Sequence, residues 1–167
     1  MVALDKLINV ELDWDVQKKN NLVLHPQNST EEIAVLSLQG RFASKAEGKW
    51  GEESWKLKRA GMRGNISISK GDAKQEVAFF KRQKLTKGTL TMQNGKTFQV
   101  ERNAAATELQ LFADTTLLIA CRGSGNTLQV FLQPAAIDFS ELPLLVIFLA
   151  YWILTVRIDA QYASYPG

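Results

Sequence analysis

The stretch that decides the fold is ELPLLVIFLAYWILTV, residues 141–156. After Glu141 it carries no charged side chain until Arg157. Ser140 can cap a helix and proline is tolerated in a first helical turn, so the pattern predicts a helix over 140–158. This helix is apolar on every side, which is typical of a membrane span or of a helix at the centre of a protein core.

Length favours the buried helix over the membrane span. The uncharged run would reach about 22 Å at 1.5 Å per residue. A bilayer core is about 30 Å thick and is usually crossed by about 20 residues. The charges that flank the run give no strong positive-inside signal, since Glu141 lies at its start and Arg157 at its end. We therefore expect a buried helix and keep a single-pass membrane anchor at 142–158 as the alternative.

Most of the chain before the helix is predicted to form about ten short strands. They alternate apolar and polar residues between turn residues, which is typical of a meandering sandwich or barrel. No helical pattern interrupts them, so a parallel sheet with helical crossovers is excluded. Asn94-Gly95 between two alternating runs predicts a hairpin with a type I′ turn. The expected strands are 9–14, 21–24, 33–38, 55–58, 66–69, 77–80, 89–92, 97–100, 109–112, 116–121 and 127–132.

Successive short strands followed by one apolar C-terminal helix resemble the tubby-like β-barrel superfamily. This group includes the tubby C-terminal domain, the LURP-one-related proteins and the phospholipid scramblases. The resemblance covers roughly 33–158 and implies an antiparallel barrel of 10–12 strands that encloses the helix. We expect one domain over 1–167, with strands in 1–139, the central helix in 140–158 and a polar tail in 159–167. The helix residues expected inside the barrel are Leu144, Leu145, Val146, Ile147, Phe148, Leu149, Trp152 and Ile153.

The resemblance also implies action at membranes. Tubby domains bind phosphoinositide head groups through basic residues, and scramblases are linked to lipid movement. This chain departs from the scramblase pattern, because it has four prolines, one cysteine and no acidic D-x-D-x-D-G loop for calcium. The resemblance therefore favours binding of anionic lipid over lipid scrambling.

Positive charge is concentrated in the first half of the chain. Residues 41–87 contain 13 Lys and Arg against 5 Asp and Glu, whereas the whole chain has 20 and 17. A concentrated positive face attracts phosphate groups of lipid or nucleic acid. The alternative is that these side chains are simply the solvated outward positions of strands. The candidate head-group ligands are Lys56, Lys58, Arg59, Arg63, Lys81, Arg82 and Lys84.

Aromatic residues lie among these lysines. Trp50, Trp55 and Phe79-Phe80 could stack bases of single-stranded nucleic acid or seat the protein at a membrane interface. We favour the alternative that Trp55 and one of the two phenylalanines face the core, because a barrel of this size needs large side chains inside. Nucleic acid is therefore an unlikely partner, anionic lipid the expected one, and a protein partner stays open.

The residues that carry catalysis or bind metals are sparse. One cysteine, Cys121, excludes an intramolecular disulfide, and with the single histidine, His25, it argues against a zinc site. We expect a buried Cys121 thiol and a solvated His25. Glu31-Glu32 and Glu52-Glu53 are expected on the surface, and Gly123-Ser124-Gly125 in a hairpin turn. We predict no catalytic residue, metal or cofactor, and hence a protein that is not an enzyme.

The first residues of the chain are acidic and lack a long apolar run. They do not match a secretory signal peptide. We therefore expect a protein that is cytoplasmic or peripheral at the cytoplasmic face of a membrane.

Overall fold

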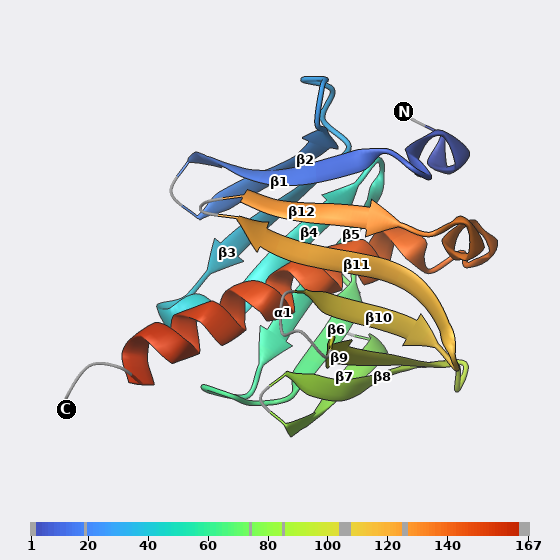
Figure 1. Ribbon diagram of the computed structural model, residues 1–167. Coiled ribbons are helices and arrows are strands. Elements are labelled where there is room, and N and C mark those ends of the chain that lie inside the picture. The colour runs from blue at the N-terminus through green and yellow to red at the C-terminus, as the bar shows by residue number, and fades with distance from the viewer. Residues whose placement is uncertain are drawn as a thin grey trace.

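The computed structural model describes residues 3–18, 20–73, 75–84, 86–103, 108–124 and 127–163. Within these ranges twelve antiparallel strands close into a barrel around one long helix (Figure 1), as the sequence predicted. Lys74 of the basic segment, Gly125 of the predicted turn and residues 164–167 of the predicted tail lie outside the described residues. The strands are β1 (Glu11–Lys18), β2 (Asn21–Pro26), β3 (Ala34–Gln39), β4 (Lys45–Trp50), β5 (Glu53–Arg59), β6 (Ile66–Lys70), β7 (Glu76–Lys84), β8 (Lys87–Met92), β9 (Thr97–Arg102), β10 (Leu109–Ala113), β11 (Thr116–Ser124) and β12 (Thr127–Leu132); the helices are η1 (Leu4–Leu7), η2 (Arg41–Ala43), η3 (Pro134–Asp138) and α1 (Leu142–Ala163).

The strand order is the simplest that a barrel can have. Every strand pairs with its neighbours in sequence, and β1 closes the ring by pairing with β12. At this seam Leu12 faces Val130 and Trp14 faces Leu128, so apolar side chains meet on the inner side. Successive strand residues point to opposite faces, which puts every second residue into the interior and leaves the polar ones outside.

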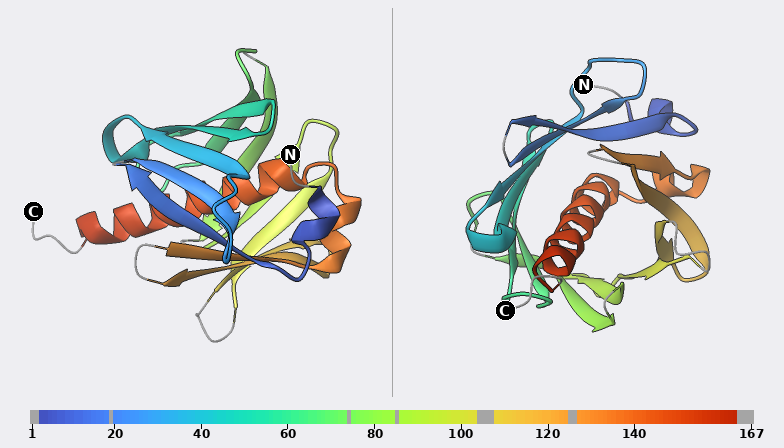
Figure 2. Two further views of the ribbon diagram at one scale, coloured as in Figure 1. Left: turned by 90° about the horizontal axis from the view of Figure 1, so that it is seen from above. Right: turned by 60° about the vertical axis from the view of Figure 1, so that its left-hand side comes forward.

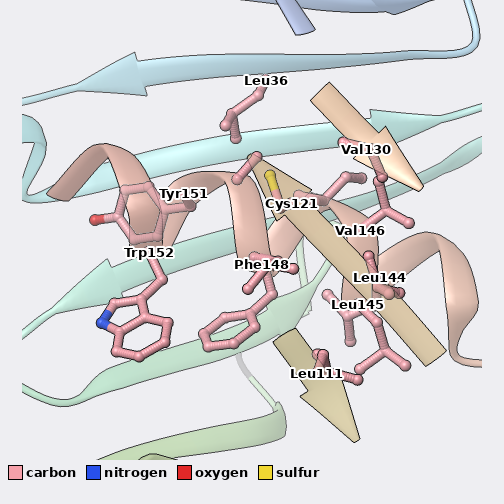
Figure 3. Close-up of a cluster of buried hydrophobic side chains, with 14 of the residues drawn as sticks. Leu36, Leu111, Cys121, Val130, Leu144, Leu145, Val146, Phe148, Tyr151 and Trp152 are labelled. Carbon is pink, nitrogen blue, oxygen red and sulfur yellow. The ribbon is translucent and has the colours of Figure 1, made fainter. Parts of the chain in front are cut away.

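The helix α1 fills the barrel. Figure 2 shows it surrounded by the strands, and the eight residues expected inside are all buried, from Ile147 at 0% exposed to Ile153 at 7%. Figure 3 shows its side chains among those of the strands. The ring of Phe80 on β7 lies 4.9 Å from that of Phe148 and 4.8 Å from that of Trp152. The all-round apolar surface of α1 is thus covered by the inner face of the barrel.

The helix is longer than predicted at its C-terminal end. It continues to Ala163, whereas the sequence pattern placed its end at Ile158. Asp159, expected in a polar tail, is therefore helical and only 1% exposed. The sequence pattern ended the helix at its first charges, but this carboxylate is neutralised inside the barrel by Arg59.

The strand that the sequence analysis missed is β4. Its inward residues are Ala46, Gly48 and Trp50, and the first two are too small to give the apolar alternation of a typical strand. They are small because α1 lies against them: a Cβ atom at Gly48 would lie 2.4 Å from the Cγ2 atom of Ile147. The barrel therefore lacks a strong strand signal at β4, where the helix lies close to the strand backbone.

The Asn94-Gly95 hairpin joins β8 and β9 as predicted. Its turn differs from type I′, because Gly95 has a positive φ (+92°) and Asn94 does not. The N–H of Gly95 donates to the carbonyl of Met92 (2.9 Å), and the Asn94 side chain accepts the N–H of Lys96 (2.9 Å). Asn94 thus stabilises the turn through its side chain.

Candidate anion-binding surface

The seven predicted head-group ligands lie on β5, on the loop after it and on β7, and they do not form one site. Lys56 and Lys58 point outward from β5 into a groove on the barrel wall. Arg63, Arg82 and Lys84 line a separate hollow at the end of the barrel where α1 leaves it. Lys81 is exposed on the outer face of β7, and Arg59 is buried.

The groove lies over the outer faces of β3 to β7 and has a volume of about 560 Å³. The strand register builds it in two cross-strand rows, because outward residues of neighbouring strands stand side by side. One row runs through Gln39, Lys45, Lys58 and Ser67. The next row runs through Ser37, Glu47, Lys56, Ser69 and Glu76.

The two rows differ in charge. In the second row Glu47 faces Lys56 across the strands, and Lys56 also has Asp72 at 3.4 Å. The first row holds two lysines and no carboxylate. Among the described residues, neither the Lys45 nor the Lys58 ammonium has an ion-pair partner. The positive charge of the groove is therefore concentrated in the first row.

Lys45 and Lys58 stand directly opposite one another on β4 and β5. The N–H of Arg59 donates to the carbonyl of Ser44 at 3.0 Å, which marks residues 44 and 59 as a hydrogen-bonded pair. The adjacent Lys45–Lys58 pair is then of the non-hydrogen-bonded kind, in which the Cα atoms are about 4.5 Å apart and the side chains are closest. Like charges in this position are destabilising, and an anion between them would remove the repulsion.

The structure corrects the prediction that Arg59 is a surface ligand. Its side chain is 2% exposed, and its Nη1 donates to both carboxylate oxygens of Asp159 at 2.9 Å. Its Nη2 donates to the carbonyl of Phe42. The alternation of β5 explains this placement: Trp55, Leu57 and Arg59 point inward, and Lys56 and Lys58 point outward.

Trp55 and one of the two phenylalanines face the core, as expected. Trp50 and Trp55 are each 5% exposed and Phe80 is fully buried, whereas Phe79 is 39% exposed on the outer face. The groove therefore presents lysines, hydroxyls and the carboxylates of Glu47 and Glu76, and neither tryptophan lines it. The buried tryptophans contribute no exposed ring for stacking bases.

His25, expected to be solvated, is half-buried on β2 between two acceptors. Its Nδ1 donates to the carbonyl of Pro26 (2.8 Å), and its Nε2 bonds to the carboxylate of Asp15. Thr127 also donates to Asp15, at 3.0 Å. Burial alone would lower the pKa of His25, but the hydrogen bonds to Asp15 and Pro26 raise it overall. Both ring nitrogens face acceptors, which favours the protonated ring, and the side chain of His25 joins β1 to β2.

Gly123 and Ser124, predicted in a hairpin turn, are instead the last residues of β11 and pair with Leu128 and Thr127 of β12. The expected burial of Cys121 and the expected exposure of the adjacent Glu pairs agree with the structure. Cys121 is buried, and burial raises the pKa of its thiol to about 12. The two adjacent Glu pairs, 31–32 and 52–53, are exposed. In the described ranges no group of three His, Cys, Asp or Glu side chains could hold a metal ion.

One described helix, Leu142–Gln161, is long and apolar enough to cross a membrane, and 78% of its most apolar stretch is buried inside the barrel. Such burial is also typical of a core helix in a soluble protein.

Comparison with known proteins gave no match to a family model, to a curated protein or to a solved structure.

Proposed function

We propose that the chain is a tubby-like barrel without enzymatic activity that binds anionic phospholipid head groups at a membrane surface. The observation that carries the proposal is the row of Lys45 and Lys58 between Gln39 and Ser67. Two unpaired ammonium groups at closest cross-strand distance, flanked by an amide and a hydroxyl, match a phosphate that accepts several hydrogen bonds. The barrel with its enclosed helix supports the tubby-like assignment.

The test is binding to sedimented vesicles of phosphatidylcholine that contain a minor fraction of a phosphoinositide. The variant K45Q/K58Q removes the two unpaired ammonium groups and keeps side chains of similar length. Each basic residue near an anionic surface contributes about 1 kcal/mol, so the partition constant should fall roughly thirtyfold.

The matched control is K6Q/R102Q, which removes two exposed charges outside the groove. It should reduce binding by much less. Equal binding of K45Q/K58Q and the unsubstituted protein would contradict the proposal.

A second candidate is a membrane-anchored assembly subunit, favoured by the length and apolar character of α1. Here the helix would leave the barrel and span a bilayer, and the strands would contact a protein partner. Retention in membranes after carbonate extraction, lost on truncation at Phe139, would support it. A full-length protein that is monodisperse without detergent would contradict it.

A further inference from the structure

The buried end of the barrel contains more positive than negative charge. Asp159 is 1% exposed and accepts hydrogen bonds from Arg59 and from the backbone N–H of Arg63 (3.0 Å). Arg82 also faces this carboxylate, with its Nη1 3.8 Å from Oδ2. Its side chain is 8% exposed. Two nearly buried guanidinium groups therefore face one carboxylate that is already engaged by Arg59.

Arg82 connects this ion pair to the surface through a hollow of about 440 Å³. Among the described residues that line it, all the charged side chains are cationic. Asn65 fixes the strand beside the hollow, because its Oδ1 accepts the N–H of Arg82 at 2.9 Å. The lining residues are Ala60, Arg63, Gly64, Asn65, Arg82, Gln83 and Lys84.

The loop that carries Arg63 is held in an uncommon conformation. Arg63 has a φ of +58°, a region that L-residues other than Asn and Asp rarely adopt. The hydrogen bond from its backbone N–H to the Asp159 carboxylate fixes this conformation, and its side chain stays exposed at the hollow. The loop thus places an exposed guanidinium over a nearly buried one.

We infer that this hollow is a second anion site, which binds a phosphate monoester between Arg82 at its base and Arg63 and Lys84 at its rim. The Arg82 guanidinium, whose Nε also donates to the carbonyl of Lys84 at 3.3 Å, would supply a charge-assisted hydrogen bond to the phosphate, and Lys84 a mobile point charge. The hollow is larger than one phosphate, so it accommodates the first groups of the esterified alcohol. The site is separate from the lysine groove and does not rest on the proposed function.

The electrostatics of Arg82 agree with this assignment. Burial lowers the pKa of Arg82, Asp159 partly offsets this effect, and the neighbouring Arg63 and Arg59 lower it further. A bound dianion would add the negative charge that this end of the barrel lacks. It would also lie next to the contacts that fix the last turns of α1.

The test uses two probes with the same phosphate monoester. Glycerol phosphate, followed by titration calorimetry, represents a free ligand; vesicles of phosphatidylcholine with phosphatidic acid represent a lipid. All proteins carry K45Q/K58Q, so that the groove does not contribute. In this background R63Q/K84Q removes two exposed charges from the hollow, and K6Q/R102Q removes two charges elsewhere.

We expect R63Q/K84Q to weaken binding at least about tenfold, or about 1.4 kcal/mol, and K6Q/R102Q to leave it within about twofold. R82K, which keeps the charge and loses the guanidinium group, should also weaken binding; circular dichroism checks its fold. If R63Q/K84Q weakens the binding of glycerol phosphate, the ligand is a free phosphate ester. If it weakens only the binding of vesicles, the ligand is a lipid. No binding of either probe, or equal loss in the two double variants, would overturn the inference.

Discussion

Replacing Gly48 with alanine tests whether α1 occupies the barrel. Gly48 has an ordinary strand conformation, so on backbone grounds alone alanine would stabilise the fold by about 0.4–1 kcal/mol. The new Cβ atom would lie 2.4 Å from Cγ2 of Ile147 and 3.2 Å from its Cδ1. Overpacking of this kind costs about 1–3 kcal/mol. We expect a net loss of about 1–2 kcal/mol, because the steric effect exceeds the entropic gain.

The assay is urea unfolding followed by tryptophan fluorescence, with thermal unfolding as a second probe. A loss of this size should lower Tm by about 3–6 °C for a domain of this length. Glu47→Ala, which changes the neighbouring outward residue of β4, is the control and should change stability by no more than about 0.5 kcal/mol.

A double-mutant cycle with Ile147→Ala sharpens the test. Shortening Ile147 leaves its Cβ atom 3.5 Å from the added methyl group, which is an ordinary contact. Ile147→Ala alone should cost about 2–5 kcal/mol, and the double variant should be more stable than the sum by about 1 kcal/mol or more. Unchanged or increased stability of Gly48→Ala, or strict additivity, would refute the packing of α1 against β4.

Three further predictions concern a buried ion pair, a buried thiol and a hydrogen-bonded histidine. Asp159→Asn leaves Arg59 buried without its partner and should cost about 3–5 kcal/mol in urea unfolding. R59M/D159L removes both charges of the pair and should cost less, although Arg82 and the backbone N–H of Arg63 also lose the carboxylate; equal losses would contradict the ion pair. The thiol of Cys121, with a pKa of about 12, should not react with Ellman's reagent in the folded protein and should react as urea unfolds it; prompt reaction of the folded protein would contradict its burial. The pKa of His25 is raised in the folded state, so its contribution to stability should be complete below the ordinary value of 6.5 and lost as pH rises through the folded value. The single imidazole signal in proton NMR would report that value, and His25→Gln should flatten the pH dependence of the urea midpoint.

The sequence determined most of the barrel because its strands alternate clearly. The run from Thr127 to Leu132, for example, has the same bounds in the structure as in the prediction. The strand β4 was not predicted because its own pattern does not alternate clearly. Its inward residues Ala46 and Gly48 are small because the helix lies against them, and the sequence of the strand does not show that contact.

The candidate site was predictable in composition and not in geometry. The predicted strands of the basic segment include β5, β6 and β7 but not β4, and which lysines share a row depends on the register between β4 and β5. Lys45 was therefore missing from the predicted ligands although it stands opposite Lys58. Arg59 was misplaced because a strand of alternating basic and apolar residues ends with one basic residue on the inner face, and its partner Asp159 lies 100 positions away.

That partner also bears on the two interpretations of α1. An ionised carboxylate in a membrane span is unfavourable by about 2.5–3.5 kcal/mol near the bilayer centre and less toward its edge. In the barrel, Asp159 accepts three hydrogen bonds within 3.0 Å from Arg59 and Arg63. Movement of α1 into a bilayer would therefore break a buried ion pair and leave Arg59 without its carboxylate. The helix is apolar enough to span a membrane over most of its length, but its last two turns carry a charge whose partners lie on the barrel. This charge favours the helix as the permanent core of the domain.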